Sequence, residues 1–304
     1  MNKNPISERA TIRNQPEKRP YGVKIELHVM TYGDLGNLHN TCFLLDTGSY
    51  FTLKAVDKAP WEAGQKLHVE LEGFATASSA EHSGKKLIQA ILWCAIKYRR
   101  TIKLNYQTYE PAYVYERNRS KGSSISSDVD LSLPPILVIN EICDGYSKLP
   151  DPDPNLLLSM EVFAASKLET SERAKYLSMV SAFELLADCK SLGEEVEEFL
   201  KSTEKSLKSN PDIPEHLKTS LSGRLLQLKK ESIRQALKRF VKEMFPEHSD
   251  IIKIIEEAYS IRSQITHEGR PNNLDIDLNS KMDEFEKIII SIYQEILNKK
   301  QNNC

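Results

Sequence analysis

The spacing of apolar residues changes near residue 150, and this change constrains the fold more than any other feature of the sequence. Before it, short runs alternate apolar and polar residues, which is typical of strands that bury one face. After Asn155, apolar residues recur every three or four positions, as in amphipathic helices. The sequence therefore predicts an α+β protein, in which a small β-rich N-terminal domain with one helix precedes an all-α helical bundle.

The expected elements follow from these periods and from the Gly, Pro, Asn and Asp residues between them. One amphipathic helix is predicted from Ser79 to Arg99, and five or six helices are predicted after Asn155, one of them over residues 224–245. Strands are predicted at residues 23–30, in two runs within 42–56, and at 66–74, 101–106, 111–116 and 135–142, the last as a buried strand.

The length of 304 residues and the hydrophobic content of 40% are sufficient for two domains with their own cores. Residues 1–20 have three prolines and no period, and are predicted to be a disordered arm. The serine-rich residues 117–135 are predicted to be a mobile loop. We expect the boundary near residue 150, which gives an N-terminal domain at 21–150 and a helical domain at 151–304.

Charge and cysteine content exclude several classes of protein. The net charge is −2, so nucleic-acid binding would have to depend on local clusters of basic residues. No apolar run has the length of a membrane span, and the five cysteines include no C-x-x-C pair. The histidines lack metal-ligand spacing, and no phosphate-binding G-x-x-x-x-G-K motif is present. We therefore expect a cytoplasmic protein with no membrane association, no metal and no cofactor.

The predicted helix before Pro271 contains the strongest candidate for chemistry. Arg262 is followed by His267 five positions later, Tyr259 lies one turn before Arg262, and Gly269 ends the helix. Five helical steps give a net rotation of about 140°, so these two side chains of one chain diverge unless the last turn unwinds. A two-fold dimer that packs this helix against its copy would bring two arginines and two histidines into one cleft, a sufficient set for acid–base chemistry at a phosphodiester.

This context resembles the HEPN superfamily of helical ribonucleases, whose signature is Arg, four to six residues, then His. The match runs from Arg262 to His267, in an all-α C-terminal bundle. Residues 176–186, YLSMVSAFELL, resemble the early HEPN helix that contributes an acid to the active site, here Glu184. The β-rich domain and its SAEHSGKKL helix are similar to the Apea-like HEPN branch of prokaryotic phage defence. Ser263 departs from this family, which often has Asn, Asp or His after the Arg.

The resemblance implies a metal-independent endoribonuclease that works as a homodimer. His267 would take a proton from the ribose 2′-hydroxyl or give one to the leaving 5′-oxygen, and Arg262 would neutralise charge on the phosphorane. Glu184, Tyr259 and Ser263 would support this pair. Because an unregulated ribonuclease would damage its host, we expect a phage-derived trigger or an inhibitory partner. The alternative is a non-catalytic HEPN-like dimerisation or binding module, whose N-terminal domain binds a ligand or a protein; Ser263 and the acidic C-terminal half favour it.

Two basic clusters are further candidates for RNA binding. Along the predicted helix 224–245 a cation recurs every four residues, as in a ridge that follows a phosphate backbone. Residues 97–121 interleave basic residues with tyrosines, a composition that suits single-stranded RNA. The alternatives are a solvated helix face and ordinary strand tyrosines. The residues concerned are Lys230, Arg234, Lys238 and Lys242 in the ridge, and Arg99, Arg100, Arg117 and Arg119 in the second cluster.

A competing motif is Phe43 to Ser49, which contains Asp46-Thr-Gly and resembles the active-site turn of an aspartic protease. That family also needs a later apolar segment that ends in Gly, but residues 135–140 end in Asn. A hairpin turn is therefore the favoured interpretation of this motif.

Overall fold

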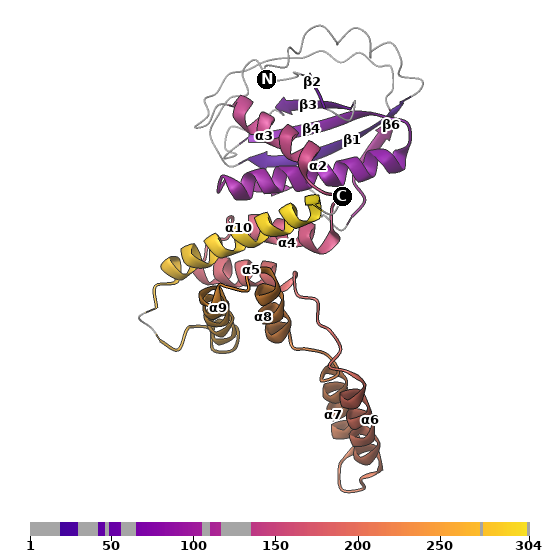
Figure 1. Ribbon diagram of the computed structural model, residues 1–304, viewed down its shortest axis with the longest axis vertical. Coiled ribbons are helices and arrows are strands. Elements are labelled where there is room, and N and C mark those ends of the chain that lie inside the picture. Colours follow the sequence, from indigo (N-terminus) through magenta and orange to yellow (C-terminus); the bar gives the residue numbers. More distant parts are fainter. Residues whose placement is uncertain are drawn as a thin grey trace. The chain divides into compact units, whose positions relative to one another are not determined.

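The computed structural model describes residues 19–29, 42–45, 49–55, 65–104, 110–116, 135–273 and 276–302. Within them the chain is α+β, with an N-terminal antiparallel sheet followed by helices (Figure 1). It divides into two compact units, residues 1–182 with 289–304, and residues 183–288. The boundary predicted near residue 150 falls inside the first unit, so a domain division at that position stays a prediction. Residues 1–18 of the predicted arm and 117–134 of the predicted loop lie outside the described residues.

The sheet has six strands in the order β2-β3-β4-β1-β5, and β6 also pairs with β1. All its described pairings are antiparallel, and β1 pairs with β4 in a register that places Ile25 opposite Val69 and Leu27 opposite Leu67. The strands are β1 (Tyr21–Val29), β2 (Cys42–Leu44), β3 (Tyr50–Ala55), β4 (Gln65–Phe74), β5 (Ile102–Leu104) and β6 (Tyr113–Glu116). The strands predicted before residue 117 are therefore confirmed.

Helix α2 (Ala77–Lys97) covers the apolar face of this sheet, as Figure 1 shows. The alternation in β1 explains the choice of face, because Val23 and Ile25 are buried while Lys24 and Glu26 project to the other side. The helix approaches β1 closely at Gly84, where an added Cβ would lie 2.7 Å from the Cγ2 atom of Val23. This position has no room for a larger side chain.

The last predicted strand, at residues 135–142, is wrong, because Pro135–Lys148 forms helix α3, which packs against α2. An apolar run of this length does not by itself distinguish a buried strand from a buried helix. The buried residues Ile139, Ile142 and Tyr146 have helical spacing, and the last of them lies beyond the predicted strand. The apolar pattern thus continues past the point at which the sequence analysis ended the strand.

Helix α4 (Pro154–Ser166) and the second half of α10 (Leu278–Asn302) share a buried polar contact in the first unit. The Ser159 hydroxyl donates to the Ala182 carbonyl oxygen over 2.6 Å and lies 2.7 Å from the Tyr293 hydroxyl, which therefore donates to it. Burial raises the pKa of Tyr293, so the phenol is neutral. The Phe163 ring packs edge-on against Tyr293.

The second unit contains α6 (Glu194–Ser209), α7 (Glu215–Gln227), α8 (Ile233–Met244) and α9 (Ser249–Glu268), together with the end of α5 (Glu172–Glu184). The single helix predicted over 224–245 is wrong, because the chain leaves helical geometry between α7 and α8. A capping box between Ser232 and Gln235 starts α8 as a new helix. The described residues therefore contain seven helices from α4 to α10, whereas the sequence predicts five or six.

Candidate functional site

Helix α9 carries the predicted catalytic residues and stays regular to its end. The Gly269 N–H donates to the Ile265 carbonyl oxygen over 3.0 Å, and Gly269 has a left-handed φ of 75°, which a residue without a Cβ adopts most easily. One face of the helix is buried, with Ile261 and Ile265 on it. Arg262 is partly buried beside that face, whereas His267 is exposed in the last turn.

Glu184, the last residue of α5, pairs with Arg262. The guanidinium Nη2 atom lies 3.4 Å from Glu184 Oε2, and Nε lies 3.4 Å from Oε1. The side chains are only 13% and 28% exposed. Within the described part of the chain, Glu184 Oε1 and Arg262 Nε make no hydrogen bond of good geometry. The contact is therefore an ion pair in which one carboxylate oxygen and one guanidinium N–H have no hydrogen-bond partner among the described residues.

Burial raises the pKa of Glu184 above its usual value, and the attraction of Arg262 only partly opposes this effect. The distances explain why burial has the larger effect. A strong charge-assisted hydrogen bond between these groups would be about 2.7–2.9 Å long, whereas both contacts here are 3.4 Å long. A carboxyl group of this kind stays protonated to a higher pH than a solvated one.

Tyr259 and Ser263 flank Arg262 on α9. The Arg262 Cζ atom lies 5.9 Å from the centre of the Tyr259 ring, which restricts the guanidinium between the ring and Glu184. Ser263 is partly buried. The structure thus brings together Glu184, Tyr259 and Arg262.

Within one chain, His267 does not join Glu184, Tyr259 and Arg262. The last turn of α9 does not unwind before Gly269, so the net rotation of about 140° between Arg262 and His267 remains. A site that uses both side chains therefore requires a second copy of α9.

The predicted basic ridge differs from its expected form. Lys230 lies in the break between α7 and α8, and the two helix residues Arg234 and Lys238 both contact Glu256 of α9, at 3.4 Å and 2.7 Å. Lys242 is exposed on α8. Two of the four cations thus share one carboxylate, which balances one of their two charges and weakens the case for a phosphate-binding ridge. No spacing in the sequence relates Glu256 to α8, so sequence reasoning missed this residue.

In the other basic cluster, Arg99 and Arg100 directly follow the C-cap of α2. Their backbone N–H groups donate to Ile96 and Ala95, and Arg99 adopts a left-handed φ of 52° in the position that usually holds glycine. The side chain of Arg99 is exposed and that of Arg100 is partly buried. Arg117 and Arg119 lie outside the described residues, as does Asp46 of the protease-like turn.

In the described residues no group of three or more His, Cys, Asp or Glu side chains is arranged to hold a metal ion. Likewise, none of the described helices combines the length and apolarity needed to cross a membrane. Comparison of the chain with protein families, with curated proteins and with solved structures finds no significant match.

Proposed function

We propose that the protein is a metal-independent endoribonuclease of the HEPN type, whose active site is completed in a homodimer. The observation that supports this proposal best is the pairing of Glu184 with Arg262 across 78 residues of sequence. The HEPN resemblance places an acid from the early helix beside the signature arginine, and these two side chains meet in the fold.

In the proposed mechanism Arg262 binds the scissile phosphate. Glu184 and the Tyr259 ring orient the guanidinium, and the Arg262 side chain remains 28% exposed, which leaves donors for a phosphate oxygen. Stabilisation of negative charge by a positioned cation is a large term in phosphoryl chemistry. Because the Arg262 charge is partly balanced by a carboxyl group whose pKa is raised, protonation of Glu184 increases the net positive charge at the site.

His267 is the proposed general acid and base. Its exposure on the last turn of α9 allows it to reach a phosphodiester held by a second protomer. The imidazole takes the 2′-hydroxyl proton, the 2′-oxygen attacks phosphorus, and the bond to the 5′-oxygen breaks as that oxygen gains a proton. The products are a 2′,3′-cyclic phosphate and a 5′-hydroxyl. DNA lacks the attacking group and would not be cleaved.

We place this activity in the cytoplasm of a prokaryotic cell, as part of a phage-defence response with a trigger or an inhibitory partner. Free cysteines suit a reducing compartment, and Cys94 and Cys189 form no disulfide.

The second candidate function is a binding module without catalysis. The observation in its favour is that one chain does not assemble Arg262 with His267, because α9 is helical through both. In that case the buried pair of Glu184 and Arg262 only joins α5 to α9.

The test is incubation of single-stranded and structured RNA with the purified chain in excess EDTA, followed by analysis of the product ends. The proposal predicts cleavage with 2′,3′-cyclic phosphate ends, and no cleavage where a 2′-deoxynucleotide precedes the scissile bond. Products with 3′-hydroxyl ends would contradict the mechanism, and intact RNA of every class would favour the binding module.

A further inference from the structure

Helices α6 and α7 form an arm, defined here as residues 194–227, that buries almost none of its side chains. The five residues between the two helices are too few for anything but an antiparallel hairpin, and the helices contact each other. Helix α6 buries Leu200 alone, and α7 buries no residue. An amphipathic helix in a monomeric domain normally buries one whole face, so the arm has more surface available for contact than its own fold uses.

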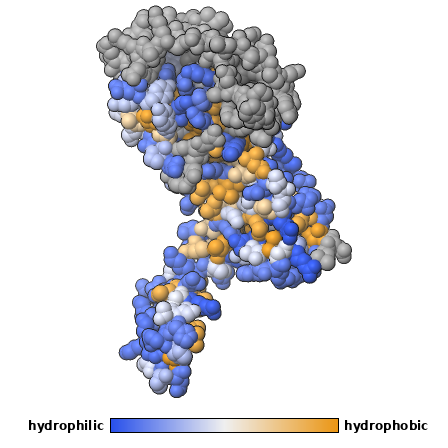
Figure 2. All heavy atoms as spheres, turned by 180° about the vertical axis from the view of Figure 1, so that it is seen from behind, coloured by the Kyte–Doolittle hydropathy of each residue, from blue (hydrophilic) through white to orange (hydrophobic). Residues whose placement is uncertain are grey.

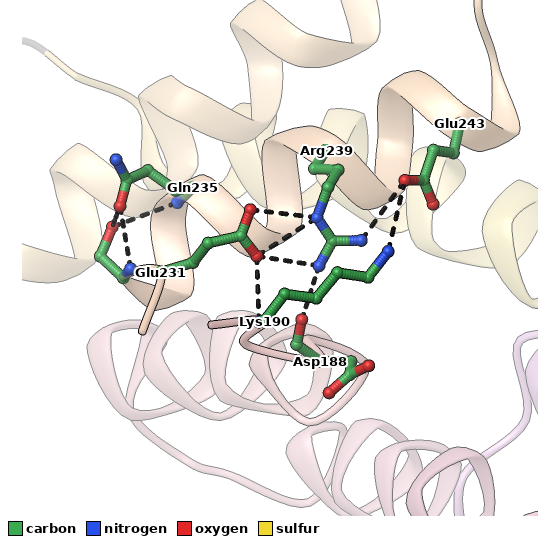
Figure 3. A network of polar contacts seen from close by, with 7 residues as sticks. Asp188, Lys190, Glu231, Gln235, Arg239 and Glu243 are labelled. Carbon is green, nitrogen blue, oxygen red and sulfur yellow. Dashed lines mark hydrogen bonds and ion pairs between the residues drawn. The ribbon is translucent and has the colours of Figure 1, made fainter. Parts of the chain in front are cut away.

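Several hydrogen bonds fix the two chain segments at the base of the arm, so the arm has a fixed attachment to α8. Backbone bonds join the two chain segments there, from the Leu192 N–H to the Lys229 carbonyl and from the Glu231 N–H to the Lys190 carbonyl. Arg239 of α8 binds both segments, since it donates to Glu231 and, over 2.6 Å, to the carbonyl oxygen of Asp188 (Figure 3). The same guanidinium contacts Glu243, so its donors are well used.

Large apolar side chains are exposed along the arm. Phe199 on α6 is 67% exposed and Leu226 on α7 is 51% exposed, and Leu217 and Leu221 repeat one turn apart on α7. Apolar residues are visible on the surface of the arm in Figure 2. Exposed apolar residues that are grouped on a pair of helices, and not scattered, are typical of an interaction surface.

A stripe of five charged residues runs along α6 beside Phe199. Four of the five are complementary to those of an antiparallel copy, and the fifth, Lys201, faces its own copy at the axis. Its members recur at alternating steps of four and three residues, so they share one face of the helix. All five are exposed: Glu194, Glu198, Lys201, Lys205 and Lys208. The order is acidic then basic, which also suits the helix dipole of a single α6. The dipole does not account for the exposed Phe199.

When two copies of α6 lie antiparallel across a two-fold axis near Lys201, Glu194 of each copy is opposite Lys208 of the other. Glu198 is then opposite Lys205, and each contact occurs twice, as two-fold symmetry requires. Among the described residues, Glu194, Glu198 and Lys205 take part in no ion pair, whereas Lys208 contacts Glu204 and keeps 64% of its side chain exposed. These charges are thus available for a partner with the same stripe.

We propose that the arm is a self-association surface, on which α6 of a second copy of this chain packs antiparallel and covers Phe199. The charges set the antiparallel register, and the apolar residues of the two arms supply the contact between them. This interface is separate from α9 and does not depend on whether the protein cleaves RNA.

Two variants of the full chain test the register. The first, Glu194→Lys with Glu198→Lys, makes the whole stripe basic, and the second, Lys205→Glu with Lys208→Glu, makes most of it acidic. Sedimentation velocity at low salt between about 1 and 100 µM measures association. Because the proposed contact through α9 would remain in both variants, the contact through α6 is measured as additional mass. We expect the unmodified chain to reach a larger average mass than either variant alone at the same concentration, and the dissociation constant of this additional step to rise at least about tenfold in each variant. An equimolar mixture of the two should associate again, because the altered stripes are complementary.

The control reverses two exposed acids away from the arm, Glu247→Lys and Asp283→Lys, and should leave association unchanged. Circular dichroism verifies that each variant keeps its helices, and Phe199→Ser weakens association without a change of charge. The proposal is overturned if the average mass of the unmodified chain never exceeds that of the stripe variants, or if the mixture associates no better than each variant alone. Because mass is measured and not cleavage, failure here is distinct from failure of the ribonuclease proposal.

Discussion

The side chains of Glu184 and Arg262 meet at 3.4 Å although 78 residues separate them in the sequence. The contact is mostly buried, but its distances are long for a charge-assisted hydrogen bond. Burial therefore has a larger effect on the carboxyl group than the guanidinium does, and the pKa of Glu184 is raised. The charge of the pair therefore changes with pH, and its effect on the free energy of unfolding can be measured.

The first prediction concerns the pH dependence of stability. Because the pKa of Glu184 is raised in the folded state, the folded chain holds this proton to a higher pH than the unfolded chain, and stability is lost as pH rises above the usual pKa of 4.5. The Glu184→Gln variant lacks this loss, because an amide does not ionise in this pH range. We expect the free energy of unfolding of the variant, relative to the unmodified chain, to rise between about pH 4 and pH 8, as measured by urea denaturation. A relative stability that falls over this range would show that attraction to Arg262 dominates.

The second prediction concerns the packing of α2 on the sheet. Gly84→Ala places a Cβ 2.7 Å from Val23, so the helix must shift, and we expect a loss of about 1–3 kcal/mol in unfolding free energy. Gly223→Ala on α7 is the matched control, since an added Cβ there meets no atom within 4 Å, and the better helix propensity should add up to about 1 kcal/mol. Equal effects at the two sites would contradict the close approach of α2 to β1.

The third prediction concerns RNA binding by the basic and tyrosine-rich residues 97–121. Changing Arg99, Arg100, Arg117 and Arg119 to Gln should weaken RNA binding, and each lost phosphate contact should reduce the salt slope by about 0.7. Fluorescence anisotropy across a range of salt concentrations measures both quantities. His267→Ala should bind as the unmodified chain does. If affinity and slope are unchanged while protection of infected cells is lost, this stretch recognises a phage protein instead of RNA.

The sequence predicts those parts of the fold in which local period decides the structure. Strand β1 alternates clearly, so Val23 and Ile25 were assignable to the buried face, and α9 ends where Gly269 predicts. The helix α3 was missed because its first eight residues have no period of their own, and the break before α8 was missed because the cations from Lys230 onward continue a helical spacing.

The candidate site was predictable only through the resemblance. Arg262 and His267 form a motif of low information, and nothing local to α5 indicates that Glu184 reaches α9. The contact of Arg234 and Lys238 with the single carboxylate of Glu256 depends on how α8 packs against α9, which no spacing in the sequence encodes.

The central claim is that Arg262 of one protomer acts with His267 of another, and complementation tests it most directly. Arg262→Gln, which keeps a donor toward Glu184, and His267→Ala are assayed for RNA cleavage in EDTA, alone and as a mixture. The account predicts that each variant alone is inactive, and that the mixture recovers about a quarter of the unmodified activity, because half of randomly formed dimers are mixed and each of these has one intact pair. A mixture as inactive as its components, or cleavage by either variant alone, would contradict it.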